Sequence, residues 1–164
     1  MDQTARFALP YLVPGQMQKE LFHNEALQRI DALLCPVIEG AAAASPPPAP
    51  LIGSCYLVAA GANGAWSGHD GALACFSEGG WRFIAPVEGM SLLERSSGQM
   101  LSRRSGAWET GILRGQELRV DGMTVVRNRQ PAIGDPSGGT VADAECRAAV
   151  SQILAALRAH GLIG

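Results

Sequence analysis

The stretch GALACFSEGGWRFIAP, residues 71–86, decides the fold that we expect for this chain. Two short runs of apolar and aromatic residues flank Ser-Glu-Gly-Gly, a composition typical of a tight turn between two strands. This stretch therefore predicts an antiparallel hairpin. Similar runs, separated by glycine-containing turns, extend from Gly53 to about Leu113. The sequence thus predicts a small β-domain in which successive hairpins form an antiparallel meander.

Tryptophan recurs just after a turn at three places in this region, Trp66, Trp81 and Trp108. Because the intervals are unequal, we interpret the pattern as a habit of hairpins and not as a true repeat. We expect Trp81 and Trp108 to fill the core of the β-domain. Trp66 suits a buried position and a sugar-stacking position about equally.

A helix is predicted before the β-domain, because apolar residues recur at three- and four-residue steps between Gln16 and Leu34. Cys35-Pro36 ends it, since proline disfavours the helical conformation in the residue before it. The helix is therefore amphipathic. The following segment GAAAASPPPAP, residues 40–50, predicts an extended polyproline conformation, either a linker or a strap laid across a surface.

The C-terminal third combines a hairpin signal with a second helix. Asp121-Gly122 predicts a two-residue turn between ELRV and MTVV. Thr140 and Asp143 resemble a capping box that starts a helix, and Gly161 suits its C-terminal cap. A short coiled-coil seam recurs along this helix, formed by Cys146, Val150, Ile153 and Leu157. The seam either packs on the chain's own β-domain or joins copies in a homo-oligomer.

These patterns predict an α+β protein, a small antiparallel β-hairpin domain flanked by an N-terminal amphipathic helix and a C-terminal helix. We expect an attachment segment and helix at 1–39, a proline-rich strap at 40–52, the antiparallel β-domain at 53–115, a hairpin and loop at 116–139, and the C-terminal helix at 140–164.

Composition narrows the partners. Apolar residues make up 47% and charged residues 17%, so we expect a partner to bury part of the surface. A net charge of −2 and a pI near 5.9 make nucleic acid an unfavourable partner.

The N-terminus lacks a secretory pattern and no apolar run approaches a membrane span, so we expect no membrane insertion. Four scattered cysteines predict reduced, mostly buried thiols, as in a protein that folds in a cytoplasm.

No catalytic, metal or cofactor site is expected. His23-Asn24-Glu25 resembles half of a zincin helix, but Leu27 stands where the second histidine is needed. His69-Asp70 lies in a glycine-flanked loop without a nucleophile motif, so we expect the aspartate to bind backbone amides of a turn. The chain is therefore predicted not to be an enzyme.

RFALPYLVPGQMQKELFHNEALQRIDALL, residues 6–34, and GSCYLVAAGANGAWSGHDGALACFSEGGWRFIAPVEGM, residues 53–90, resemble the domain-of-unknown-function 2793 family of prophages and gene transfer agents of alphaproteobacteria. The resemblance implies a structural subunit of a head spike or phage fibre. Such a protein is made in the bacterial cytoplasm and assembled into the virion, at a capsid vertex in a gene transfer agent. Its implied partners are its own copies, as a pentamer or trimer, and capsid or other spike proteins.

On this interpretation the polar residues of the first helix fasten the subunit to its neighbours. The residues expected in this attachment interface are Gln16, Gln18, Lys19, Glu20, His23, Asn24 and Glu25.

Two alternatives remain open. The first alternative to a spike subunit is a carbohydrate-binding module that contacts host surface polysaccharide through Trp66, His69 and Asp70. The second is a capsule-degrading enzyme. The enzyme is the weaker alternative, because no convincing carboxylate pair stands out.

Overall fold

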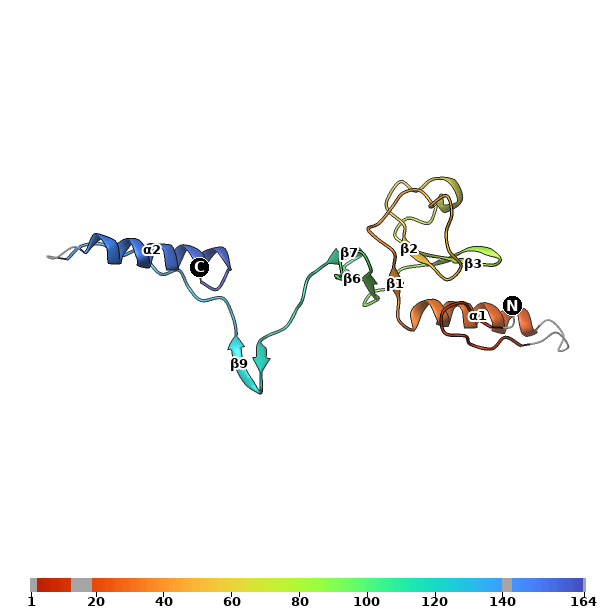
Figure 1. Cartoon of the computed structure of the whole chain (residues 1–164), viewed down its shortest axis with the longest axis horizontal. Helices are drawn as coiled ribbons and strands as arrows, with labels where there is room; N and C mark the ends of the chain where they lie inside the picture. Colours follow the sequence, from red (N-terminus) through yellow and green to blue (C-terminus); the bar gives the residue numbers. More distant parts are fainter. Residues whose placement is uncertain (1–2, 13–18, 140–142, 164) are drawn as a thin grey trace. The chain divides into compact units, whose positions relative to one another are not determined.

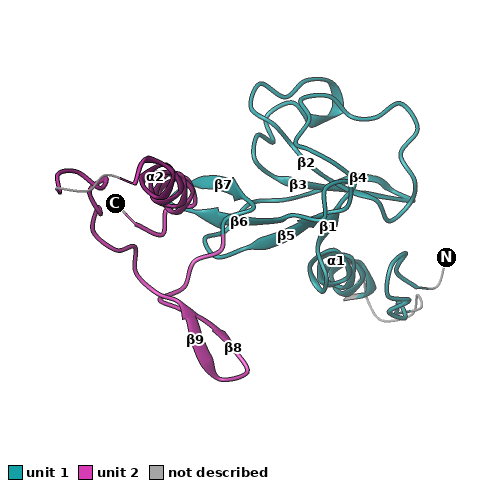
Figure 2. Cartoon of the chain, turned by 60° about the vertical axis from the view of Figure 1, so that its left-hand side comes forward, with its two compact units in different colours: residues 1–112 teal, residues 113–164 magenta. Residues whose placement is uncertain are grey.

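The computed structural model describes residues 3–12, 19–139 and 143–163, and the chain divides into two compact units, 1–112 and 113–164 (Figures 1 and 2). Unit 1 contains α1 (Lys19–Leu33), β1 (Val37–Ile38), β2 (Cys55–Leu57), the 3₁₀ turn η1 (Gly64–Trp66), β3 (Leu73–Ser77), β4 (Gly80–Ile84), β5 (Ser91–Glu94), β6 (Met100–Arg104) and β7 (Ala107–Thr110). Unit 2 contains β8 (Leu118–Val120), β9 (Met123–Val126) and α2 (Ala144–Ala159).

The α+β prediction is confirmed, since a helix near each end of the chain flanks a mostly antiparallel β region in sequence. The hairpin predicted from residues 71–86 is also present: β3 pairs with β4 from Leu73 opposite Ile84 to Ser77 opposite Gly80. Local turn chemistry was sufficient for this part of the fold.

The β-domain is not one meander. Its strands form two sheets, with the orders β2-β3-β4 and β1-β5-β6-β7. In the second sheet Val37 pairs with Leu93 in a parallel ladder. The sequence gives no signal for this pairing, because β1 has two residues and its partner is more than fifty positions away. The expectation of purely sequential hairpins is therefore wrong at this edge.

Two buried clusters stabilise unit 1, and the first of them contains residues of both sheets. One cluster includes the wholly buried Ile38, Leu73 and Leu92. The other surrounds Trp66, which is 0% exposed and meets Trp81 edge-on with 5.2 Å between ring centroids. These two clusters supply most of the large apolar side chains that are buried in unit 1.

The proline-rich segment is a strap. Its Ala43 N–H donates to the Leu57 carbonyl at 3.0 Å, and its carbonyl accepts from the Ala59 N–H at 2.8 Å. Ala43 also packs against the Trp66 cluster. The segment therefore belongs to unit 1 as a covering layer, which decides between the two alternatives that the sequence left open.

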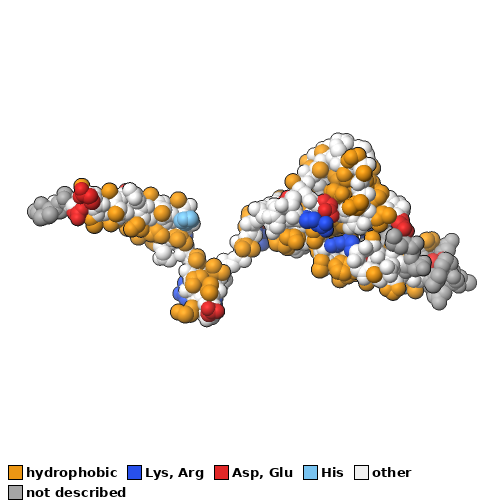
Figure 3. Space-filling model, in the orientation of Figure 1, with side chains coloured by type: hydrophobic (Ala, Val, Ile, Leu, Met, Phe, Trp, Pro, Cys, Tyr) orange, Lys and Arg blue, Asp and Glu red, His pale blue; other side chains and the backbone are white. Residues whose placement is uncertain are grey.

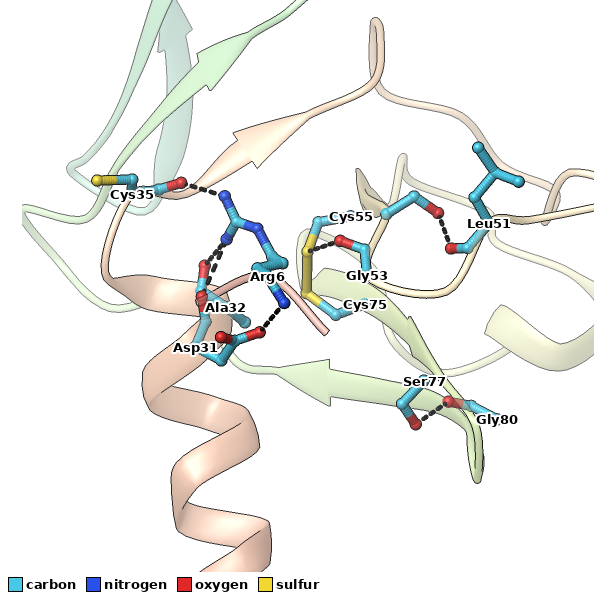
Figure 4. The surroundings of a disulfide bond; sticks show 11 residues. Arg6, Asp31, Ala32, Cys35, Leu51, Gly53, Cys55, Cys75, Ser77 and Gly80 are labelled. Atoms are coloured by element: carbon cyan, nitrogen blue, oxygen red, sulfur yellow. Dashed lines mark hydrogen bonds between the residues drawn. A yellow bond between two sulfur atoms is a disulfide. The ribbon is translucent and has the colours of Figure 1, made fainter. Parts of the chain in front are cut away.

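The cysteines depart from expectation. Cys55 and Cys75 form a disulfide (Figure 4). Cys35 and Cys146 are exposed free thiols. The prediction of reduced, mostly buried thiols is therefore wrong. Cys55 faces Cys75 directly across β2 and β3 with 4.2 Å between Cα atoms, as in the closer, non-hydrogen-bonded pairs of an antiparallel ladder. Only the strand register reveals this proximity.

Unit 2 confirms the predicted turn. Asp121 and Gly122 both have positive φ, 49° and 76°, as the type I′ turn between β8 and β9 requires.

Both ends of α2 are capped. Gly161 ends the helix, because its N–H donates to the Arg158 carbonyl while the Leu162 N–H donates to the Leu157 carbonyl, a Schellman motif. The expected start is corrected: Asp143 is the N-cap and accepts from the Cys146 N–H, and Thr140 lies outside the described residues.

No helix in the described parts of the chain has the length and hydrophobicity that crossing a membrane requires.

Candidate assembly surfaces

Helix α1 presents a polar face to the rest of unit 1. Asp31 is only 5% exposed, and its carboxylate accepts from the Thr4 hydroxyl at 2.6 Å and from the backbone N–H groups of Arg6 and Phe7 at 3.0 and 2.7 Å. A buried carboxylate with several donors is well satisfied. Asp31 therefore fastens the N-terminal segment 3–12 to the helix.

Arg6 reinforces this junction. Its guanidinium donates to the carbonyls of Asp31 and Ala32 near the end of α1, and to that of Cys35 just beyond it (Figure 4). Carbonyls in the last turn of a helix lack intrahelical partners, and a cation there also suits the helix dipole. Sequence reasoning missed Arg6 and Asp31, since nothing local links positions so far apart.

Two residues expected in an attachment interface make contacts within the chain. Glu25 accepts from Arg82 Nε on β4 at 2.9 Å and lies 3.6 Å from Arg29 on the same helix. Asn24 accepts from the Leu12 N–H and donates to the Leu12 carbonyl. Both side chains therefore orient α1 on unit 1 and do not lie on its outer face.

The other residues of the expected interface are distributed differently. His23 is exposed, and Glu20 is half-buried with its Oε2 atom covered. Lys19 is the first residue of α1, and Gln16 and Gln18 lie outside the described residues.

Four apolar residues of α1 lie on the opposite side from Asp31. At 3.6 residues per turn, Phe22, Ala26, Ile30 and Leu33 share one face of the helix, and all four are exposed. Phe22 is 81% exposed and Ile30 47%. We call these four residues the outward stripe. The predicted helix is present, but these four apolar residues face solvent, whereas Asp31 and Ala32 face the domain.

The expected sugar platform is not available. Trp66 is wholly buried, so its indole presents no face to a ligand, and its assignment as a sugar contact is wrong. A covering layer from the strap and neighbouring strands accounts for the burial. The His69 ring stacks on Phe83 with 3.6 Å between centroids, so one of its faces is already used.

Asp70 organises the loop instead. Its carboxylate accepts from the backbone N–H groups of Gly61 and Ala62, each at 3.0 Å, and these hydrogen bonds lower the pKa of Asp70 from its ordinary value of 3.8. The expectation that this aspartate satisfies backbone amides of a turn is confirmed.

A pocket lies between α1, the N-terminal segment 3–12 and the sheet that carries the disulfide. Ala32, Ile84 and the disulfide supply its apolar lining, and Arg6 and Arg82 stand among its polar residues. Both arginines already bind acceptors of the chain. Within the described residues no group of three or more side chains is suited to hold a metal ion. We therefore assign no ligand to this pocket.

Most residues of the predicted seam on α2 are exposed to solvent. Cys146, Val150 and Ile153 are exposed, whereas Leu157 is half-buried. Leu154, beside the seam, is the buried residue of this helix.

The chain is thus an α+β protein whose first helix is held by Asp31, Glu25 and Ala32 and turns the outward stripe to solvent. It belongs to the DUF2793 family of proteins of unknown function, which matches residues 23–109. The match spans most of α1, the strap and both sheets of unit 1. No curated protein matches the chain.

Proposed function

We propose that this chain is a structural subunit of a spike or fibre on a tailed phage-like particle of the gene-transfer-agent kind. Its N-terminal part anchors the spike at the capsid, and the rest supports attachment to the host surface. Made in the bacterial cytoplasm, the subunit then becomes a virion component. Family membership and the resemblance of residues 6–34 and 53–90 support this proposal.

The outward stripe of α1 is the observation that carries the proposal. Burying a large apolar side chain stabilises a complex by about 1.5–3 kcal/mol relative to leaving it in water. A helix that keeps Phe22 and Ile30 in solvent therefore forgoes stability that a partner surface would restore. The contacts of Asp31 and Glu25, together with the buried Ala32, hold the helix in this orientation without help from the outward stripe.

The partner that fits is a hydrophobic groove on the capsid or on another spike protein. An amphipathic helix binds such a groove through residues spaced at three and four positions, as the outward stripe is. His23 and Arg29 are exposed at the two sides of the stripe and suit the polar rim of such an interface.

Direct sugar binding is not part of the proposal, because Trp66 is buried. Attachment to host polysaccharide then belongs to a surface formed by several subunits or to a protein that the spike carries.

The test is incorporation into particles. Phe22→Ser with Ile30→Ser removes the centre of the outward stripe, while the contacts of Asp31 and Glu25 remain. We expect this double variant to fold and to be at least tenfold depleted from particles purified by density gradient. The matched control is Leu51→Ser, which changes a 77% exposed leucine elsewhere in unit 1.

Circular dichroism and tryptophan fluorescence establish that the double variant is folded. Particles that carry the double variant at the level of the control would exclude α1 as the anchor. Absence of the unaltered protein from particles would remove the structural proposal altogether.

A further inference from the structure

On one face of the β8–β9 hairpin, polar side chains bind one another in a network. Glu117 lies at the centre of this face: its carboxylate accepts from Arg119 Nε at 2.6 Å and from the Thr124 hydroxyl at 2.9 Å, and it lies 3.6 Å from Arg127 Nε. Arg119 and Thr124 are cross-strand partners and therefore point to the same side. This polar face needs no further partner.

The other face of the hairpin is apolar and uncovered. Leu118 pairs with Val126, and Val120 with Met123, so the strand register places these four residues on the side opposite the Glu117 network. All four are exposed, Met123 to 73%. A two-stranded hairpin in water is marginal even with good turn chemistry. The apolar face is therefore the part that requires a partner.

Helix α2 likewise leaves large apolar side chains exposed to solvent. Its N-cap and Schellman motif define both ends, and Leu154 and Ile163 are the buried apolar residues of unit 2 within the described parts of the chain. Val150 and Ile153 remain exposed on its surface. A unit of about fifty residues whose described part buries two apolar side chains has too small a core to be stable alone. Figure 3 shows hydrophobic side chains on both the hairpin and α2.

We propose that unit 2 is an association module whose core is completed by unit 2 of further copies of this chain. The six exposed apolar side chains of the hairpin face and of α2 present on the order of 600 Å² per copy, so two copies would bury about 1,200 Å², the lower range of specific interfaces. A two-fold pair of copies, in which the hairpin face and the α2 face of each copy are covered by the other, buries this full area. The inference rests on the proposed function in one respect: a spike is built from several copies of its subunit.

The test is the absolute mass of the full-length chain in solution by light scattering. We expect a multiple of 17.2 kDa for the unaltered chain. Val120→Thr with Met123→Thr removes apolar surface and places at both positions threonine, whose branched Cβ suits a strand. We expect it to raise the dissociation constant at least tenfold. Arg119→Thr, on the polar face of the same strand, is the matched control and keeps the mass of the unaltered chain.

A second variant pair tests α2. Ile153→Gln should weaken association, and Gln152→Ala, at an adjacent exposed position, should not. Circular dichroism shows whether the helix survives each change. A monomeric unaltered chain at 100 μM, or an oligomer that survives the hairpin and helix changes combined, would overturn the inference.

Failure of this inference is separate from failure of the proposed function. An oligomer that dissociates in the hairpin variant supports the inference even where the chain is absent from particles. Conversely, particles that contain the chain as single copies overturn the inference and leave the spike proposal in place.

Discussion

The two units of this chain differ in how much apolar surface their described residues bury. Unit 1 surrounds Trp66, Ile38, Leu73 and Leu92 with two sheets, a strap and a disulfide. Unit 2, in the residues that the structure describes, has well-formed turns and caps but little apolar interior. Local structure in unit 2 is thus encoded without a core of its own. The difference teaches that correct turn and cap chemistry specifies a shape, whereas buried apolar area supplies its stability.

The largest effect is expected in the interior of unit 1. Trp66→Ala leaves a cavity at a site with 0% exposure and should destabilise unit 1 by about 3–5 kcal/mol, measured by urea unfolding followed by circular dichroism. Leu51→Ala, at a side chain of the same unit that is 77% exposed, should change stability by no more than about 0.5 kcal/mol. Equal effects would break the contrast between interior and surface.

The disulfide is expected to contribute the next largest effect. Replacing Cys55 and Cys75 together by alanine should lower the free energy of unfolding of unit 1 by about 2–4 kcal/mol, because the bond restricts the unfolded chain. Cys35→Ser with Cys146→Ser is the control and should leave the urea midpoint unchanged. If a reducing agent does not shift the midpoint of the unaltered protein, the bond is not a stabilising element.

The next prediction concerns unit 2 and removes the N-cap of α2, because this unit has little buried core to disrupt. Asp143→Ala removes the acceptor of the Cys146 N–H and should cost about 0.5–2 kcal/mol of helix stability, measured as loss of helical signal on heating. The control is Asp135→Ala, which removes an exposed ion pair with Arg158 and should cost no more than about 1 kcal/mol. A larger loss for Asp135 than for Asp143 would contradict the capping assignment.

The smallest effect is expected at Asp70, on the surface of unit 1. Because its folded pKa lies below the ordinary 3.8, the carboxylate contributes stability above that pH and loses it as the pH falls through the folded pKa. Asp70→Asn should therefore be less stable than the unaltered chain at pH 7, and the difference should close between about pH 5 and 2. A difference independent of pH would mean that the carboxylate's charge plays no part.

Sequence reasoning succeeded where the determinants are local. The 71–86 hairpin, the Asp121-Gly122 turn and the Gly161 cap all depend on residues that are neighbours in the chain. It also found the helical periodicity of α1, since that pattern needs only a window of residues.

It failed where the partner of a residue is distant. Periodicity identifies an apolar face but not what it faces, so the inward placement of Asp31 and the outward placement of Phe22 could not be foreseen. Burial of Trp66 depends partly on Ala43 of the strap, 23 positions away. The Cys55–Cys75 bond follows from strand register, which spacing alone does not reveal.

The same bond has a consequence for proteolysis of the chain. Cys55 and Cys75 are 20 positions apart, and the loop they close contains η1, Trp66 and the Asp70 turn. A protease that cuts the backbone once inside this loop produces two pieces that stay covalently joined through the sulfur atoms. The nicked chain would keep its full length on a non-reducing gel and separate only after reduction, so a single cut there does not detach α1 from the β-sheets.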